Sequence, residues 1–136
     1  MNKQIEIKTE EYAEKVTREL MDKYQISDIY LLGFSQGCGL TYTTGIRYYD
    51  LYKGLICFGG WLNMDRLSDD DIASAKELKV FIAQGKDDNM VEFKEGEIVE
   101  KQLTEMGYDV KFPEFKGAIA FLKKLWRMLR SGWDFN

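Results

Sequence analysis

The chain has 136 residues, of which 45% are hydrophobic and 31% are charged, and this composition is typical of one soluble globular domain with a core of its own. The net charge of −4 and the isoelectric point near 5.0 argue against nucleic acid as a partner, because nucleic-acid-binding domains favour basic patches. No apolar run approaches the ~20 residues of a membrane span, and the start MNKQIEIKTEEYAEK is too polar for a secretory signal. We predict a single domain over residues 1–136, located in the cytoplasm and without stable membrane insertion.

Histidine is absent from the sequence, and the only cysteines are Cys38 and Cys57. A disulfide is disfavoured in a cytosolic chain, so we expect both thiols to be free and buried. A zinc site would lack a ligand set, because zinc in proteins is held mainly by histidine and cysteine. We therefore expect neither a metal nor a cofactor.

The first predicted element is an amphipathic helix over residues 8–24. Its apolar side carries Tyr12, Val16 and Leu20 at steps of four, with charged residues between them. Thr9 is a suitable N-cap, because its hydroxyl can accept a hydrogen bond from a free N–H of the first turn.

A strand and a second helix come next, over residues 29–34 and 36–49. The run IYLLGF is apolar throughout, which predicts a strand covered on both faces. Glycines lower the helix propensity of the second segment, and close packing of its backbone beside a strand would explain them. These glycines are Gly37, Gly39 and Gly45.

Two further strands are predicted at residues 54–59 and 79–84, where the sequence reads GLICFG and KVFIAQ. The acidic segment between them indicates a loop with a short helix, for which Ser68 is a suitable N-cap. Asp69, Asp70 and Asp71 are interpreted as a solvated loop or helix start.

The last predicted elements are a helix over residues 91–107, a strand over 109–115 and a final helix after Gly117. The first of these helices has Val99, Leu103 and Met106 on one face and Gly107 just past its C-terminus. Pro113 cannot donate to a ladder, which indicates an edge strand or a strand end. The final helix carries Lys123, Lys124, Arg127 and Arg130 beside an apolar stripe, and we expect this stripe to pack against the sheet.

Strands that alternate with helices predict an α/β fold with a parallel sheet covered on both faces. The expected architecture is three layers, α/β/α, with about four parallel strands joined by right-handed crossovers.

The sequence Gly33-Phe34-Ser35-Gln36-Gly37 lies between a predicted strand and a predicted helix. A Gly-x-Ser-x-Gly in this context is a nucleophile elbow, a tight turn that displays a serine hydroxyl at the carboxyl edge of a sheet. Very small residues are expected at Gly33 and Gly37, where strand and helix crowd together. The backbone N–H of Gln36 would point at an oxyanion.

Several segments resemble the phospholipase/carboxylesterase branch of the α/β-hydrolases, a dienelactone-hydrolase-like branch. They are GFSQG at residues 33–37, YKGLICFGGWL at 52–62, VFIAQGKDDNMV at 80–91 and GYDVKFPEFKG at 107–117. The resemblance spans roughly residues 10–117 and corresponds to the C-terminal part of such hydrolases. It implies a shortened α/β-hydrolase fold and hydrolysis of small acyl esters or thioesters.

The resemblance also implies roles for individual residues. Ser35 would be the nucleophile and Asp88 the triad acid, since Gly85, Asp88 and Val91 fit the family's spacing after the third strand. Gln84 stands where many members have a histidine that is not the triad base. Trp61 would line either an acyl pocket or the core.

The family's catalytic histidine is missing from its usual place. Where members commonly have Phe-x-Gly-x-His, this chain has Phe115, then Gly117, then Ile119, so either isoleucine replaces the base or the loop is deleted. A serine hydroxyl is a weak nucleophile without a base, and Lys86 or Lys116 could serve only if burial lowered its pKa. We therefore expect impaired or no activity, and the alternative is a non-catalytic interaction module or engineered scaffold derived from a hydrolase.

Family members also begin with further strands, one of which is followed by a loop that gives the second oxyanion N–H. Without such strands the elbow strand would have an open, apolar edge. Open edges invite pairing with another chain, so we predict a homo-oligomer, a dimer that covers this edge or the apolar face beside it.

Overall fold

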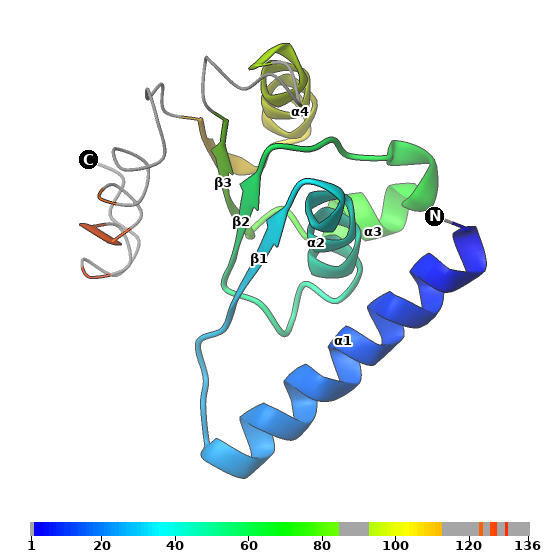
Figure 1. Cartoon of the computed structure of the whole chain (residues 1–136), viewed down its shortest axis with the longest axis vertical. Coiled ribbons are helices and arrows are strands. Elements are labelled where there is room, and N and C mark those ends of the chain that lie inside the picture. The colour runs from blue at the N-terminus through cyan, green and yellow to red at the C-terminus, as the bar shows by residue number, and fades with distance from the viewer. Residues whose placement is uncertain (1, 85–92, 113–122, 124–125, 128–129, 131–136) are drawn as a thin grey trace.

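The computed structural model describes residues 2–84, 93–112, 123, 126, 127 and 130, and its centre is a four-stranded parallel sheet in the order β1-β2-β3-β4 (Figure 1). The sheet is flanked by helices, as the sequence predicts. The strands are β1 (Tyr30–Phe34), β2 (Gly54–Phe58), β3 (Lys79–Ala83) and β4 (Asp109–Lys111). Parallel pairing places all the strand carboxyl ends at one edge of the sheet, where sites of α/β proteins form.

The helices alternate with the strands along the chain. They are α1 (Lys3–Tyr24), α2 (Gln36–Arg47), α3 (Asp69–Ser74) and α4 (Phe93–Glu105), and a 3-10 turn, η1 (Met64–Arg66), precedes α3. This turn was not predicted. Of the final helix, residues 123, 126, 127 and 130 are helical and exposed. Its packing against the sheet stays a prediction, because most of it lies outside the described residues.

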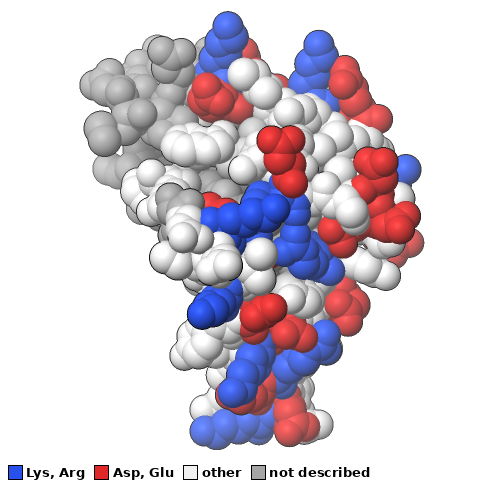
Figure 2. Space-filling model, turned by 90° about the vertical axis from the view of Figure 1, so that its right-hand side faces the viewer, with Lys and Arg blue, Asp and Glu red and all other residues white. Residues whose placement is uncertain are grey.

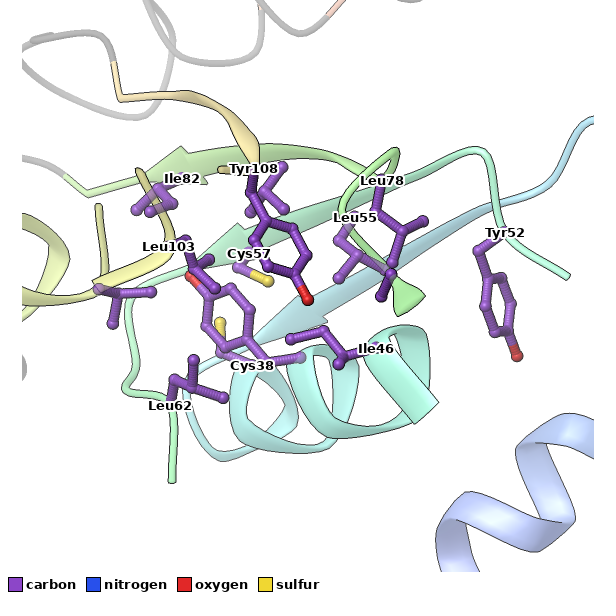
Figure 3. Packing of buried hydrophobic residues seen from close by; sticks show 14 of the residues in the cluster. Cys38, Ile46, Tyr52, Leu55, Cys57, Leu62, Leu78, Ile82, Leu103 and Tyr108 are labelled. Atoms are coloured by element: carbon purple, nitrogen blue, oxygen red, sulfur yellow. The ribbon is translucent and has the colours of Figure 1, made fainter. Parts of the chain in front are cut away.

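The core lies between the sheet and helices α2 and α4. Figure 3 shows Cys38 and Ile46 of α2 meeting Leu55 and Cys57 of β2, and Leu103 of α4 packs into the same cluster. Both cysteines are free and buried, as predicted. Their burial in the apolar layer makes them part of the packing.

Close approach of α2 to β2 accounts for one of the predicted glycines. A Cβ atom on Gly45 would lie 2.2 Å from Cδ2 of Leu55, so a larger residue would push the helix off the strand. At Gly39 the same atom would make an ordinary contact, 3.6 Å from the carbonyl oxygen of Trp61. The explanation by close packing therefore holds for Gly45 and is weaker for Gly39.

Helix α1 begins five residues before the predicted start. Its N-cap is Asn2, whose side chain accepts a hydrogen bond from the N–H of Gln4 at 2.8 Å. Thr9 lies inside the helix, where its hydroxyl donates to the carbonyl of Ile5 at 2.7 Å, so the predicted cap was wrong. Asparagine caps a helix at least as well as threonine.

The predicted buried side of α1 was also wrong. Tyr12 is 69% exposed and Leu20 is 42% exposed, whereas Glu10 and Thr17 are buried. The helix turns its polar side inwards because Glu10 meets cationic partners on α2 and η1. On the face viewed in Figure 2, acidic and basic side chains are interspersed over the length of α1.

Strand β1 stands at the end of the strand order, and only one of its two faces is covered. Leu31 packs against the core and Gly33 is buried, whereas Leu32 is 52% exposed and Phe34 is 74% exposed. The prediction of a strand covered on both faces is therefore wrong for β1. It holds for β2, where Leu55, Ile56 and Cys57 are all buried.

Three further local predictions agree with the structure, whereas the prediction for Pro113 lies outside the described residues. Ser68 caps α3 and forms a capping box with Asp71, so the acidic run is a helix start. Val99 and Leu103 of α4 are buried, and Gly107 follows the helix with φ 95°, a conformation that favours glycine. In the part of the chain that the structure describes, no helix is both long enough and apolar enough to cross a membrane.

Candidate active site

Ser35 sits at the junction of β1 and α2 with φ 53° and ψ −116°. A non-glycine residue rarely adopts this conformation, and such strain is concentrated at functional sites. The backbone N–H of Ser35 donates to the carbonyl of Phe58 at 2.8 Å, and the carbonyl of Ser35 accepts from the N–H of Cys38 at 3.0 Å. These two bonds hold the turn from both sides.

Gly33 makes this turn possible. A Cβ atom there would lie 2.3 Å from Oγ1 of Thr41 and 2.4 Å from the carbonyl oxygen of Gly37, distances that no side chain tolerates. At Gly37, by contrast, a Cβ atom would meet nothing within 4 Å. The predicted need for a very small residue is thus met at Gly33, and it is wrong for Gly37.

A third glycine closes the turn from the neighbouring strand. Gly60, with φ 153°, follows β2, and a Cβ atom there would lie 2.6 Å from the carbonyl oxygen of Ser35. It would also lie 2.5 Å from Cβ of Cys38. The backbone after β2 therefore lies directly against the elbow.

A cavity of about 180 Å³ opens beside Ser35. It brings together Ser35, Gln36 and Trp61, three of the four residues singled out from the sequence. Trp61 is 55% exposed and lines the cavity. The other lining residues are Glu6, Gly39, Leu40, Thr43, Asn63 and Arg66.

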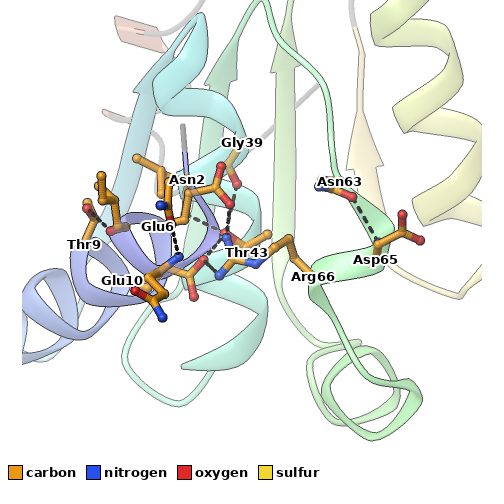
Figure 4. Close-up of polar contacts among 12 residues, drawn as sticks. Asn2, Glu6, Thr9, Glu10, Gly39, Thr43, Asn63, Asp65 and Arg66 are labelled. Atoms are coloured by element: carbon orange, nitrogen blue, oxygen red, sulfur yellow. Dashed lines mark hydrogen bonds and ion pairs between the residues drawn. The ribbon is translucent and has the colours of Figure 1, made fainter.

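One wall of the cavity is charged. Arg66 of η1 pairs with Glu6 and with Glu10, the latter at 2.7 Å, and its side chain is only 5% exposed. Glu10 also pairs with Arg47 of α2 and accepts from the hydroxyl of Thr43 at 2.8 Å. Figure 4 shows Glu6 and Glu10 of α1, Thr43 of α2 and Arg66 of η1 converging. Two carboxylates face two guanidinium groups, so the formal charges of the cluster cancel.

Sequence reasoning missed this wall entirely. Its contacts join residues that are 33 to 60 positions apart, so no local spacing reveals them. The only available signal was that Glu6 and Glu10 lie one helical turn apart on the same side of a helix. That signal is common on solvated helices.

The two thiols offer no replacement nucleophile. Burial, followed by the neighbouring Cys38, raises the pKa of the Cys57 thiol well above its usual range. Burial also raises the pKa of the Tyr42 hydroxyl well above its ordinary value, with Cys57 adding to the shift. The Sγ of Cys38 lies 3.0 Å from the carbonyl oxygen of Phe58 and points into the core. A thiolate is the reactive form of cysteine, and burial disfavours it at Cys57.

The remaining predicted site residues lie outside the described residues. These are Asp88, the two candidate bases Lys86 and Lys116, and Ile119 at the family's histidine position. Gln84, at the end of β3, is described and is 2% exposed. Among the described residues, no cluster of three or more acidic, cysteine or histidine side chains could hold a metal ion.

Comparison with known proteins places this fold and elbow in a family. The sequence matches the family model for phospholipase/carboxylesterase over residues 1–121. The chain belongs to the phospholipase/carboxylesterase family. The elbow at Ser35 and the alternating strands are therefore inherited parts of an α/β-hydrolase.

Individual relatives of this phospholipase/carboxylesterase chain are longer than it is. A probable carboxylesterase of Oryza sativa subsp. japonica is 27% identical over 103 residues, which make up 75% of this chain and 39% of that protein. SOBER1 of Arabidopsis thaliana has a TM-score of 0.79 at 19% identity, over 96% of this chain and 66% of that one. The carboxylesterase of Bacillus cereus has a TM-score of 0.75 at 16% identity, over 96% and 63%. The two structural likenesses establish the fold, and the chain spans no more than about two thirds of each relative.

Proposed function

We propose that this chain is a serine-hydrolase-like protein of the carboxylesterase or thioesterase class, with turnover impaired or absent. The observation that carries the proposal is the strained backbone of Ser35, displayed at a strand-to-helix turn and facing a cavity. Such a turn serves to expose a serine oxygen to a bound acyl group. Family membership supports the same reaction class.

In the proposed reaction Oγ of Ser35 forms a bond to the carbonyl carbon of an ester or thioester. The leaving group departs with its bonding electrons and takes up a proton, and water then releases the acyl group. The N–H of Gln36 would donate to the developing oxyanion, because it is the first N–H of α2. Asp88 would be the triad acid, on the strength of the resemblance alone.

Proton transfer is the weak point of this chemistry. The hydroxyl proton must go to a base, and the 136 residues include no histidine. Loss of a triad member leaves only the oxyanion hole and binding, roughly 10³–10⁴-fold over water. An aspartate whose ordinary role is to orient an imidazole does not replace that imidazole.

The size of the cavity is compatible with an acyl group. A cavity of about 150 Å³ accommodates a benzene molecule, so the space of about 180 Å³ beside Ser35 is large enough for a short acyl chain. Its walls combine Trp61 and Leu40 with the polar groups of Thr43 and Asn63. We infer a small substrate with a polar group.

A fluorophosphonate probe tests whether Ser35 is activated. The probe transfers its phosphonyl group to a nucleophilic serine oxygen with loss of fluoride, and intact mass reports the adduct. Stoichiometric labelling that disappears in Ser35→Ala and persists in Ser27→Ala, which changes an exposed loop serine, would support the hydrolase. Absence of labelling over hours would overturn catalysis by this serine.

The second candidate is a non-catalytic interaction module on a hydrolase scaffold. The specific observation in its favour is the absence of histidine. On this reading the elbow is retained as architecture, and an unlabelled but folded chain is the expected result. The cytoplasmic location and the exclusion of nucleic acid stay predictions from the sequence.

A further inference from the structure

The cavity beside Ser35 extends along one side of α2. Its lining residues from this helix and its N-cap lie at positions 35, 36, 39, 40 and 43, a spacing that keeps residues on one face of a helix. At a rise of 1.5 Å per residue, the step from Ser35 to Thr43 covers about 12 Å along the helix axis. The cavity therefore has a nucleophile end at Ser35 and a distal end at Thr43.

The guanidinium group of Arg66 lies at the distal end. Its Nη2 donates to Oε1 of Glu10 at 2.7 Å, and the hydroxyl of Thr43 donates to the same oxygen at 2.8 Å. Arg66 lines the cavity although its side chain is only 5% exposed to solvent. Figure 4 shows its side chain reaching from η1 towards Glu10 and Thr43. The cation is therefore level with Thr43 and not with Ser35.

The two carboxylates that hold Arg66 leave part of its guanidinium group unused. Glu6 accepts from Nη1 and Glu10 accepts from Nη2, and no described residue accepts a hydrogen bond from Nε. A guanidinium group carries five N–H donors in one rigid plane, so two carboxylates that orient the group also fix the direction of its other donors. The structure thus supplies a preorganised, charged donor at the distal end.

The charges around this donor favour a neutral acceptor over an anion. Glu6 lines the cavity and bonds to Arg66 through Oε2, while its Oε1 has no bond to a described residue. A ligand carboxylate at Nε would share the cavity with this second oxygen, and like charges repel. A carbonyl or hydroxyl oxygen would accept the same hydrogen bond without that repulsion.

The distance between the two ends sets the length of the ligand. Attack by Oγ of Ser35 takes about 3 Å to the ester carbon, and the hydrogen bond from Nε of Arg66 takes about 2.9 Å. About 6 Å of the 12 Å along the helix then remains between the ester carbon and the acceptor oxygen. An extended chain with bonds of about 1.5 Å covers this distance in about five bonds.

We propose that Arg66 determines substrate specificity, because its Nε–H binds a neutral oxygen about five bonds from the scissile carbonyl carbon. The substrate class is a short-chain ester or thioester with a keto or hydroxyl oxygen on the fifth carbon of the acyl chain. Glu6 and Glu10 are positioning residues that orient the guanidinium group. The inference rests on the proposed function, since it takes Ser35 as the point of attack.

Arginine side-chain NMR tests this contact without turnover. The protein is ¹⁵N-labelled Ser35→Ala, and the Nε–H resonance of Arg66 is assigned by through-bond correlation to its backbone. Three probes share a methyl ester and the same chain length. Methyl 5-oxohexanoate carries a ketone, methyl 5-methylhexanoate has a methyl group in place of the ketone oxygen, and monomethyl glutarate carries a carboxylate.

We expect methyl 5-oxohexanoate to shift the Nε–H of Arg66 and the backbone N–H of Gln36, which lie at opposite ends of the cavity. The other two probes should bind about tenfold more weakly or worse, since a hydrogen bond from a charged donor contributes that much affinity. Equal affinity for all three probes, or binding of none, would overturn the role of Arg66. Tighter binding of monomethyl glutarate would overturn the choice of a neutral oxygen.

Two arginine variants locate the preference on one side chain. Arg66→Lys keeps a positive charge beside Glu6 and Glu10 but lacks the planar set of donors, so it should lose the preference for the ketone. Arg18→Lys makes the same change at a 51% exposed side chain of α1 and should keep the preference. An unchanged preference in Arg66→Lys would overturn the proposal.

Two glutamate variants test the charge argument and do not depend on the folding of Arg66→Lys. Glu6→Gln should raise the affinity for monomethyl glutarate relative to methyl 5-oxohexanoate, because it removes the like charge from the cavity. Glu14→Gln, at a side chain that is equally exposed at 26%, should not. Equal effects would overturn the argument for a neutral oxygen. Fluorophosphonate labelling of Ser35 decides hydrolysis separately, because these titrations involve no bond to serine.

Discussion

Ser35 keeps a conformation that costs a non-glycine residue on the order of 1–3 kcal/mol, so its neighbours must enforce it. Enforcement comes from the bonds of Ser35 to Phe58 and Cys38 and from the close contact of Gly33 with α2. The strain therefore depends on residues of two strands and one helix. A substitution that relaxes the packing at Gly33 should release the turn.

The two glycines of the elbow give a matched test of this packing. Gly33→Ala should lower the free energy of unfolding by about 1–3 kcal/mol or more, because its Cβ would overlap Thr41 and the backbone of Gly37. Gly37→Ala should leave stability unchanged or raise it by about 0.5–1 kcal/mol, since the site is open and alanine favours a helix. Urea unfolding of both variants measures the difference. Equal effects would contradict the crowding at Gly33.

Tyr108 gives a prediction at alkaline pH. Its hydroxyl donates to the carbonyl of Ile72 at 2.8 Å, and burial, followed by the charge of Asp71, raises its pKa from 10.0 to about 12. Above pH 10 the unfolded chain loses a proton that the folded chain retains. The stabilisation is therefore complete below pH 10 and is lost as pH rises through about 12, with a slope of up to about 1.4 kcal/mol per pH unit.

Tyr108→Phe removes this titration. The stability difference between wild type and variant should be constant from pH 7 to 9 and should shrink as pH approaches 12. The other tyrosines titrate equally in both proteins, so the difference isolates Tyr108. Parallel stability curves up to that pH would contradict the shifted pKa.

At the scale of elements, ion pairs hold α1 against α2 and η1. Its two fully buried side chains are polar: Glu10 contacts Arg47, Arg66 and Thr43, and the hydroxyl of Thr17 bonds to that of Tyr52 at 2.8 Å. Met21 adds a partly buried apolar contact with the core. Removal of one partner from a buried ion pair leaves an uncompensated charge. The docking of α1 should therefore depend strongly on the carboxylate of Glu10.

The same substitution at two glutamates of α1 tests this dependence. Glu10→Gln should lower the free energy of unfolding by about 3–5 kcal/mol, because Arg66 and Arg47 lose their shared partner. Glu14→Gln should cost less than about 1 kcal/mol, since its partner Arg18 is 51% exposed. Chemical denaturation measures both, and limited proteolysis would show whether α1 detaches first. A loss at Glu10 no larger than that at Glu14 would contradict a docking role.

For most elements, the position along the chain could be predicted from the sequence better than the neighbours that each element contacts. Apolar runs and caps gave the strands and most helix limits, because those signals are local, as at Ser68 and Gly107. The inward side of α1 could not be predicted, since it is decided by Arg47 and Arg66, far along the chain. The charged wall of the cavity could not be predicted for the same reason.

At the scale of the whole molecule, the elbow and its strand follow from one sequence motif, whereas coverage of the sheet does not. An apolar run such as that of β1 can occur in a central strand or in an edge strand, because the two differ only in the neighbouring strands that are present. Within the described residues the structure places β1 at the end of the strand order, which the sequence of β1 alone does not reveal.

The segment after β2 lies directly against the elbow, because a Cβ atom on Gly60 would overlap the carbonyl of Ser35 and Cβ of Cys38. The backbone geometry of Ser35 is therefore coupled to the carboxyl end of β2 as well as to its own strand. A substitution at Gly60 should alter the display of the serine hydroxyl although it leaves the Gly-x-Ser-x-Gly sequence unchanged.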